Sequence, residues 1–318
     1  MNNAMVVARS HEVLSRHART FRWAALLLPS DSHDDAAVLY AFCRAVDDAA
    51  DESAHTALAL RDLRALQDGL HDRRTSLPLC RAVQDLVARR GMNLTPFDQL
   101  IDGVRSDLGS VRVQDDDELL SYCYQAAGTV GLMMCGVLGV VDPRGFRHAV
   151  DLGIGMQLTN ICRDVLEDAA MGRVYLPATR LRRHGLSHDD ILEGRAPGSL
   201  VAAVVAELLA LADRYYASAD AGVRYIPGRS RLAILSASRI YRAIGSELIR
   251  TQQGDPLRGR CVVSRLRKLG WFAVACVAWL WRPRHDGPHD AHLHNPIAPL
   301  IDAALDDDVV TSYRMNGG

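Results

Sequence analysis

Residues 157–168 read Gln157-Leu158-Thr159-Asn160-Ile161-Cys162-Arg163-Asp164-Val165-Leu166-Glu167-Asp168, one of two acidic segments in the chain. On a helix, four of its polar side chains fall at i, i+3, i+7 and i+11 and form one stripe on an otherwise apolar surface. The four are Gln157, Asn160, Asp164 and Asp168. Such a stripe must face a cavity or partner groups, because unpaired buried amides and carboxylates are costly. The segment therefore predicts a long, largely buried helix with a polar site on one face.

A second acidic segment lies earlier in the chain and reads Arg44-Ala45-Val46-Asp47-Asp48-Ala49-Ala50-Asp51-Glu52. Asp47 and Asp51 lie one turn apart, as do Asp164 and Asp168, and like charges at that spacing cost a helix about 0.2–0.5 kcal/mol per pair. Divalent cations give a reason to build the pattern twice, since Mg²⁺ binds a few carboxylate oxygens and completes its shell with water and substrate phosphates. We therefore expect two facing helices to form an acidic mouth that binds Mg²⁺ and diphosphates. A solvated helix face is the alternative for either segment alone. The arginines expected to contact phosphate oxygens are Arg44, Arg163 and Arg173.

Composition excludes several classes of protein. The net charge of −1 argues against a nucleic-acid binder, which normally carries a basic excess. The seven cysteines are scattered without a C-x-x-C pair, so we expect reduced thiols in a cytoplasmic protein. The first residues lack a basic stretch followed by an apolar one, so we expect no signal peptide. The longest apolar run, residues 126–141, is shorter than the ~20 residues that span a bilayer.

Helical periodicity dominates the chain, and no segment alternates like a strand, so we predict an all-α fold. One domain is expected over residues 1–282. The segment 283–318 contains His285, His289, His292 and His294, and we interpret it as a flexible polar tail rather than a metal site, because nothing fixes the geometry of these histidines. The predicted helices cover residues 11–28, 36–50, 58–71, 79–90, 96–108, 117–140, 144–170, 200–221, 229–253 and 262–281.

The expected central helix is rich in glycine, which costs up to about 1 kcal/mol per residue relative to alanine. Its glycines are Gly128, Gly131, Gly136 and Gly139. They would either allow close helix packing or keep a tunnel wall free of side chains, and the sequence leaves both open.

The chain resembles the squalene/phytoene synthase family from about residue 19 to residue 269, and within it the bacterial phytoene synthases. The matching blocks are Leu39-Tyr40-Ala41-Phe42-Cys43-Arg44, Asp102-Gly103-Val104-Arg105-Ser106-Asp107-Leu108, Tyr122-Cys123-Tyr124, Val130-Gly131-Leu132-Met133, Gln157-Leu158-Thr159-Asn160-Ile161, Arg163-Asp164, Gly172-Arg173-Val174-Tyr175-Leu176-Pro177, Ile240-Tyr241-Arg242-Ala243-Ile244-Gly245 and Asp255-Pro256-Leu257-Arg258-Gly259-Arg260. The resemblance implies a single-domain isoprenoid synthase fold whose helices surround an apolar cavity with an acidic mouth.

The resemblance also implies a prenyltransferase that joins two prenyl diphosphates head to head. The catalytic residues it implies are Asp47, Asp51, Asp164, Asp168, Tyr122 and Tyr241. The substrate-binding residues are Thr20, Phe21, Tyr40, Arg44, Gly131, Gln157, Asn160, Arg163, Arg173 and Tyr175. The metal ligands are Asp47, Asp48, Asp51, Asn160, Asp164 and Asp168. The expected cofactor is Mg²⁺, with Mn²⁺ as an alternative, and no NADPH is expected.

In the family's two-step route, an allylic cation forms as diphosphate departs and is captured by the second substrate to give a cyclopropyl intermediate. A second ionisation, rearrangement and proton loss then give phytoene. Cations and arginine stabilise departing diphosphate, and the carbocation needs a dry pocket with aromatic faces. The resemblance to phytoene synthases favours geranylgeranyl diphosphate as the substrate.

Alternative functions remain open. Farnesyl diphosphate would make the protein a C30 dehydrosqualene synthase or a presqualene diphosphate (hopanoid-type) synthase. A non-catalytic assembly factor on the same fold would be expected to lose the metal-binding aspartates, all of which are present. Residues 271–281, flanked by arginine and lysine, would either dip into the inner face of a membrane or pack on the core. Downstream carotenoid enzymes are further candidate partners.

Overall fold

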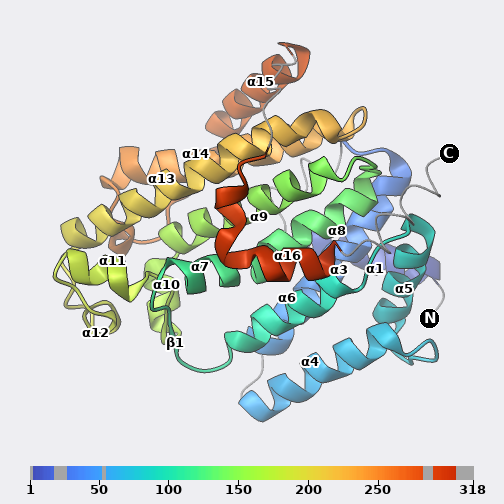
Figure 1. Cartoon of the computed structure of the whole chain (residues 1–318), viewed down its shortest axis with the longest axis horizontal. Coiled ribbons are helices and arrows are strands. Elements are labelled where there is room, and N and C mark those ends of the chain that lie inside the picture. Colours follow the sequence, from blue (N-terminus) through green and yellow to red (C-terminus); the bar gives the residue numbers. More distant parts are fainter. Residues whose placement is uncertain (1–2, 18–26, 52–54, 282–288, 306–318) are drawn as a thin grey trace.

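Figure 1 shows the computed structural model, which describes residues 3–17, 27–51, 55–281 and 289–305. Nearly all of these residues lie in helices or the turns between them, which confirms the all-α prediction. The long helices are α1 (Asn3–His17), α3 (Ser30–Asp51), α4 (Thr56–His71), α5 (Pro78–Arg90), α6 (Thr95–Ser106), α8 (Thr129–Leu138), α9 (Arg144–Arg163), α13 (Gly198–Gly222), α14 (Ser230–Gln252) and α15 (Arg265–Trp281). The short ones are α7 (Asp116–Cys123), α10 (Val165–Ala170), α11 (Ala178–Arg183), α12 (His188–Leu192), η4 (Ala291–Ile297) and α16 (Ala298–Ala304).

Several helix ends fall where the sequence predicts them. A proline in the first turn of α5 and of α6 starts each helix, and Gly91 ends α5 in a left-handed conformation at φ 61°. The first helix differs, because α1 begins at Asn3 rather than residue 11, and part of its expected extent lies outside the described residues. The second helix also begins earlier than predicted, because α3 starts at Ser30 rather than residue 36 and the polar residues 30–35 form its first turns.

Two predicted helices are interrupted. The expected helix over 117–140 is α7, a π-helical turn at Tyr124–Gly128, and α8. The acidic helix stops at Arg163, and Asp164 leaves the helical region at φ −102° and ψ 15° before α10 begins. The Asp164 N–H still donates to the Asn160 carbonyl at 2.9 Å, so the chain keeps its helical course through the break.

Two short strands were not predicted. β1 (Val111–Arg112) pairs in parallel with β2 (Arg173–Val174). Two residues per strand are too few to show an alternating pattern, so periodicity could not reveal them. Tyr175 follows β2 directly, so the strand pairing holds this tyrosine beside the acidic residues.

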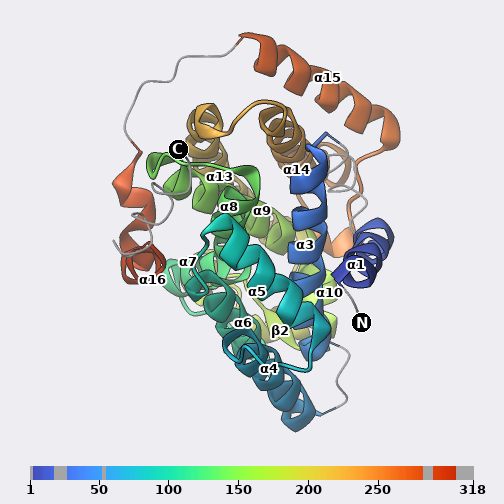
Figure 2. The same ribbon diagram turned by 90° about the vertical axis from the view of Figure 1, so that its right-hand side faces the viewer.

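Helix α9 lies at the centre of the molecule, surrounded by other helices (Figure 2). α9 packs against α13 and α8 and also touches α14, while α3 and α6 pack on α8. The buried side chains of α9 include Ile154 and Leu158, each 0% exposed, and they join the main hydrophobic core. This arrangement leaves an interior space between α3, α8, α9 and α14.

The C-terminal prediction is wrong for residues 289–305. This segment forms η4 and α16, and the Tyr215 hydroxyl donates to the Leu293 carbonyl at 2.8 Å. Four of its apolar residues are spaced i, i+4, i+8 and i+11, which is one helical stripe that the many histidines obscured. The stripe is buried and comprises Leu293, Ile297, Ile301 and Ala304. Residues 283–288 and 306–318 of the expected tail lie outside the described part of the chain.

α15 lies at the edge of the molecule on the outer side of α14 (Figures 1 and 2). Among the described residues, no helix combines the length and apolarity needed to cross a bilayer.

Candidate active site

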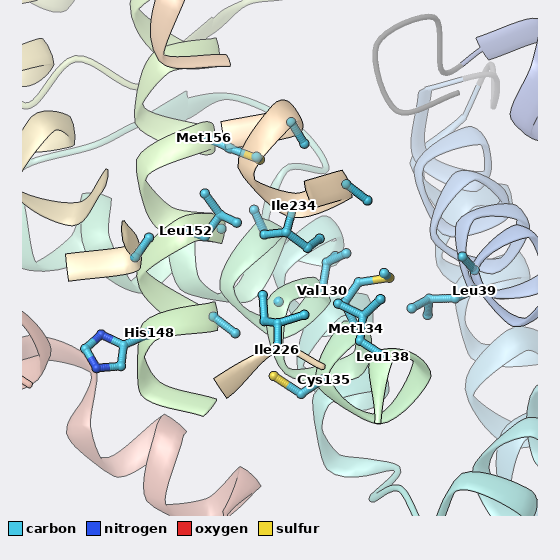
Figure 3. A pocket seen from close by; sticks show the side chains of 18 of the residues that line it. Leu39, Val130, Met134, Cys135, Leu138, His148, Leu152, Met156, Ile226 and Ile234 are labelled. Carbon is cyan, nitrogen blue, oxygen red and sulfur yellow. The ribbon is translucent and has the colours of Figure 1, made fainter. Parts of the chain in front are cut away.

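An apolar cavity of about 360 Å³ occupies the space between α3, α8, α9 and α14. Figure 3 shows Val130 and Met134 of α8, Leu152 and Met156 of α9, and Ile234 of α14 around it. Small residues, such as Ala126 of the π-helical turn and Ala149 of α9, leave room between these side chains. The cavity can therefore hold long hydrocarbon chains away from water.

A polar pocket of about 200 Å³ adjoins the cavity. Asp47, Gln157 and Asn160 line both spaces, so the two meet at these three side chains. We call this polar pocket the acidic mouth. Its lining comprises Asp47, Ala50, Asp51, Val104, Asp107, Tyr122, Gln157, Asn160, Ile161, Asp164, Asp168, Met171, Arg173 and Tyr175. The two predicted acidic segments thus face each other across one pocket.

The carboxylates of the mouth share a crowded negative environment. Enclosure by protein, together with the charges of Asp51 and Asp48, raises the pKa of Asp47 to about 7, although Arg44 opposes the shift and water still reaches the side chain. Burial and then the charge of Asp164 raise the pKa of Asp168 to about 7. Positive charge at this place would favour the ionised carboxylates.

Arginines neutralise part of this charge. The Arg163 guanidinium donates to both carboxylate oxygens of Asp164, with Nε to Oδ1 at 2.6 Å. Arg173 Nη1 donates to Asp51 Oδ1 at 3.2 Å, which links β2 to the end of α3. Arg173 lines the mouth, and Arg163 holds the mouth residue Asp164; their contacts with phosphate oxygens stay predictions.

Arg44 and Asp48 are placed differently. They form an ion pair with each other at 2.5 Å, one turn apart on α3, and neither is among the residues that line the mouth or the cavity. Their predicted roles in phosphate and metal binding stay predictions.

The donor set of the mouth fits Mg²⁺. Asn160 Oδ1 is buried and has no hydrogen-bond partner within the described residues, as expected for an oxygen that is free to bind a cation. Among those residues, no three mouth carboxylates present oxygens within 4.8 Å of one another. The arrangement therefore suits separate ions that each take one or two carboxylates and complete their shells with diphosphate and water.

Two tyrosines form one wall of the mouth. The rings of Tyr122 and Tyr175 stack with centroids 4.6 Å apart, and the Tyr122 hydroxyl donates to Asp107 Oδ2 at 2.9 Å. Tyr40 and Tyr241 instead line the apolar cavity, and burial raises the pKa of Tyr241 to about 12. All four phenols are therefore neutral at physiological pH, and their rings offer faces to a cation.

Gly131 serves helix packing. A Cβ at this position would lie 2.2 Å from the Ala149 carbonyl oxygen, so α8 and α9 approach each other through this glycine. Gly153 has the same relation to the Ala127 carbonyl oxygen, also at 2.2 Å. Gly131 also lines the cavity, so at this position the glycine both allows close helix packing and leaves the cavity wall free of a side chain. Thr20 and Phe21 lie outside the described residues.

Sequence reasoning assigned no role to two residues that the structure brings to the site. Asp107 lies in the mouth, where burial raises its pKa to about 6, and Arg260 Nε lies 3.4 Å from Asp164 Oδ1. Both belong to blocks that carry the family resemblance. Neither shares a helix face with the two acidic segments, so periodicity could not single them out.

Comparison with known proteins agrees with this geometry. A family model described as squalene/phytoene synthase matches residues 14–267. A 15-cis-phytoene synthase from Paracoccus sp. is 36% identical over 282 residues, which cover 85% of this chain and 90% of that protein. A phytoene synthase from Cereibacter sphaeroides is 33% identical over 303 residues, which cover 91% of this chain and 84% of that protein.

Solved structures give the same result. A dehydrosqualene synthase matches with a TM-score of 0.80 and 28% identity, covering 88% of this chain and 98% of that one. A squalene synthase from Alicyclobacillus acidocaldarius matches with a TM-score of 0.72 and 26% identity, covering 79% and 95%. The chain therefore belongs to the squalene/phytoene synthase family of prenyltransferases.

Proposed function

We propose that this enzyme joins two molecules of geranylgeranyl diphosphate head to head to give phytoene, using Mg²⁺. The observation that carries the proposal is that the acidic mouth adjoins the apolar cavity, with Asp47, Gln157 and Asn160 lining both. A prenyl diphosphate has the same division, with an anionic head and a long apolar chain. The head would lie in the mouth and the chain in the cavity.

The length of the cavity supports a C20 chain. Asn160 at the mouth and His148 at the far end lie on α9, twelve residues apart, which corresponds to about 18 Å of helix. With carbon–carbon bonds of about 1.5 Å, an extended geranylgeranyl chain measures about 19 Å and a farnesyl chain about 14 Å. The relatives that are named phytoene synthases favour the same substrate.

The residues of the mouth would divide the work as follows. Asp47, Asp51, Asp164 and Asp168, with Asn160, would hold Mg²⁺, which when bound supplies positive charge to the departing diphosphate. Arg163 and Arg173 would exchange their carboxylate partners for phosphate oxygens, which are equally good acceptors for a guanidinium.

The resulting allylic cation would lie at the boundary of mouth and cavity. The rings of Tyr40 and Tyr241 would stabilise it there, and the apolar walls would exclude water. Capture by the second substrate would give the cyclopropyl intermediate, and a second ionisation in the same mouth would lead to phytoene after proton loss.

We further propose that α15 contacts a membrane surface. Its inner side, with Trp271 and Ala275, packs around α14, while Leu266, Val277 and Leu280 are between 55% and 81% exposed. Arg265 and Lys268 on the same helix suit anionic headgroups. The opposite side of α14 lines the cavity, so a membrane at α15 would lie close to a product that is insoluble in water.

A second candidate is the C30 reaction on farnesyl diphosphate, which the similarity to a dehydrosqualene synthase favours. The test is product analysis after incubation with Mg²⁺ and either the C20 or the C15 diphosphate, without NADPH. Phytoene from the C20 substrate at the higher kcat/KM supports the proposal. Preferential turnover of the C15 substrate would assign the C30 reaction instead.

A further inference from the structure

A buried carboxylate near the far end of the cavity is surrounded by imidazoles. Asp151 of α9 is 0% exposed, and its Oδ2 lies 2.7 Å from His289 Nε2 and 3.9 Å from His148 Nδ1. Its Oδ1 lies 2.7 Å from His294 Nε2. The Ser218 hydroxyl of α13 donates to Oδ2 at 2.5 Å and also lies 3.1 Å from His148 Nδ1. None of the three histidine side chains is more than 10% exposed.

The groups around Asp151 are all possible metal ligands. Those that the structure describes in contact with it are nitrogens of three imidazoles and one hydroxyl. A buried carboxylate needs compensation from its surroundings, and a cation beside these atoms would supply it.

The donors come from two distant parts of the chain. His148 and Asp151 lie one turn apart on α9, and His289 lies at the start of the C-terminal segment. Structural zinc sites likewise take their ligands from separated short segments. One donor atom each of His148, Asp151 and His289 lies within 4.8 Å of the other two.

We propose that His148, Asp151 and His289 bind a divalent transition-metal ion, for which Zn²⁺ is the best match. Imidazole nitrogens with one carboxylate suit Zn²⁺, whereas Mg²⁺ prefers oxygen ligands and belongs to the mouth. Bonds of about 2.0–2.2 Å place tetrahedral donors about 3.3 Å apart, so His289 would move away from Asp151 by roughly 0.6 Å. Ser218 or water takes the fourth position.

His294 has an outer role in this site. Its Nε2–H donates to the oxygen of Asp151 that faces away from the ion, and such contacts orient the ligands of metal sites. The ion thus connects the C-terminal segment to α9 beside the cavity. Because the ligands come together only in the folded chain, binding stabilises the native state. This site is independent of the reaction proposed above.

The test measures zinc in the full-length protein. The chain is stripped with a chelator, equilibrated with one equivalent of Zn²⁺ in excess Mg²⁺, freed of unbound metal by gel filtration, and assayed by plasma mass spectrometry. We expect about one zinc per chain in the wild type and less than a tenth of that in His289→Ala. His292→Ala is the matched control, because His292 lies on the same segment but is exposed, and it should retain zinc. Asp164→Asn, in the mouth, should also retain it.

Two further variants sharpen the result. His294→Ala should weaken zinc affinity about 10- to 100-fold without abolishing it, as removal of an outer contact does. If circular dichroism shows that His289→Ala is unfolded, His148→Gln provides the same test. A wild-type protein that retains no zinc, or zinc that is lost in Asp164→Asn but kept in His289→Ala, would overturn the proposal and leave a hydrogen-bonded cluster.

Discussion

Replacing Gly131 with alanine tests how α8 and α9 enclose the cavity. The new Cβ would lie 2.2 Å from the Ala149 carbonyl oxygen, whereas real Cβ atoms stay beyond 3.0 Å, so the two helices must separate by about 1 Å. Overpacking of this kind costs about 1–3 kcal/mol, and the upper value applies because the obstacle is backbone. The higher helix propensity of alanine returns up to about 1 kcal/mol. We therefore expect a net loss of about 2 kcal/mol.

The assay is thermal unfolding of Gly131→Ala beside a matched glycine variant. With an unfolding entropy of about 2.1 cal/mol/K per residue, 2 kcal/mol lowers the Tm of a chain of this size by about 3 °C. Gly270 of α15 is helical too, but a Cβ there would meet no atom within 4 Å, so Gly270→Ala should raise the Tm slightly. A Gly131→Ala protein as stable as the wild type would refute the packing argument.

Three further predictions concern the mouth and α15. Because the pKa values of Asp47 and Asp168 are raised to about 7 from about 3.9 in the unfolded chain, the metal-free native state binds more protons and loses stability as pH rises from about 4 to 7. Mg²⁺ should therefore raise the Tm more at pH 8 than at pH 6, and equal shifts in calorimetry would contradict this. Asp107→Asn, which can still accept the Tyr122 hydrogen bond, should raise the Mg²⁺ concentration for half-maximal activity about 10-fold with little change in Tm; an unchanged Mg²⁺ titration would count against a role for this carboxylate. Val277→Glu should reduce co-sedimentation with anionic vesicles at unchanged Tm, because Val277 is 55% exposed, and undiminished sedimentation would remove α15 from the membrane contact.

Most of the fold was predictable because the signals that start and end its helices act locally. Proline at the start of α5 and glycine at its end act through their own backbone preferences, whatever the rest of the chain does. The polar stripe with Gln157 and Asn160 is also a local pattern, because its spacing on one apolar helix is enough to predict an interior site. The structure places both residues where the mouth meets the cavity.

The remaining features depend on contacts between distant segments. Asp107 reaches the mouth only because α6 ends beside Tyr122, and no spacing within the sequence encodes that meeting. His289 and His294 looked like part of a polar tail, because their partner Asp151 lies far away on α9. Close approach at Gly131 likewise depends on the neighbouring helix, so the sequence could not separate packing from an open wall.

In the reaction that we propose, the mouth releases diphosphate from two prenyl chains held in the cavity. The most direct measurement is the ratio of diphosphate released to C40 hydrocarbon formed from geranylgeranyl diphosphate with Mg²⁺. We expect two diphosphates per phytoene in the wild type, and neither product after chelation of Mg²⁺ or in Asp164→Asn. Diphosphate release without a joined hydrocarbon, or unchanged turnover in Asp164→Asn, would contradict the proposed reaction.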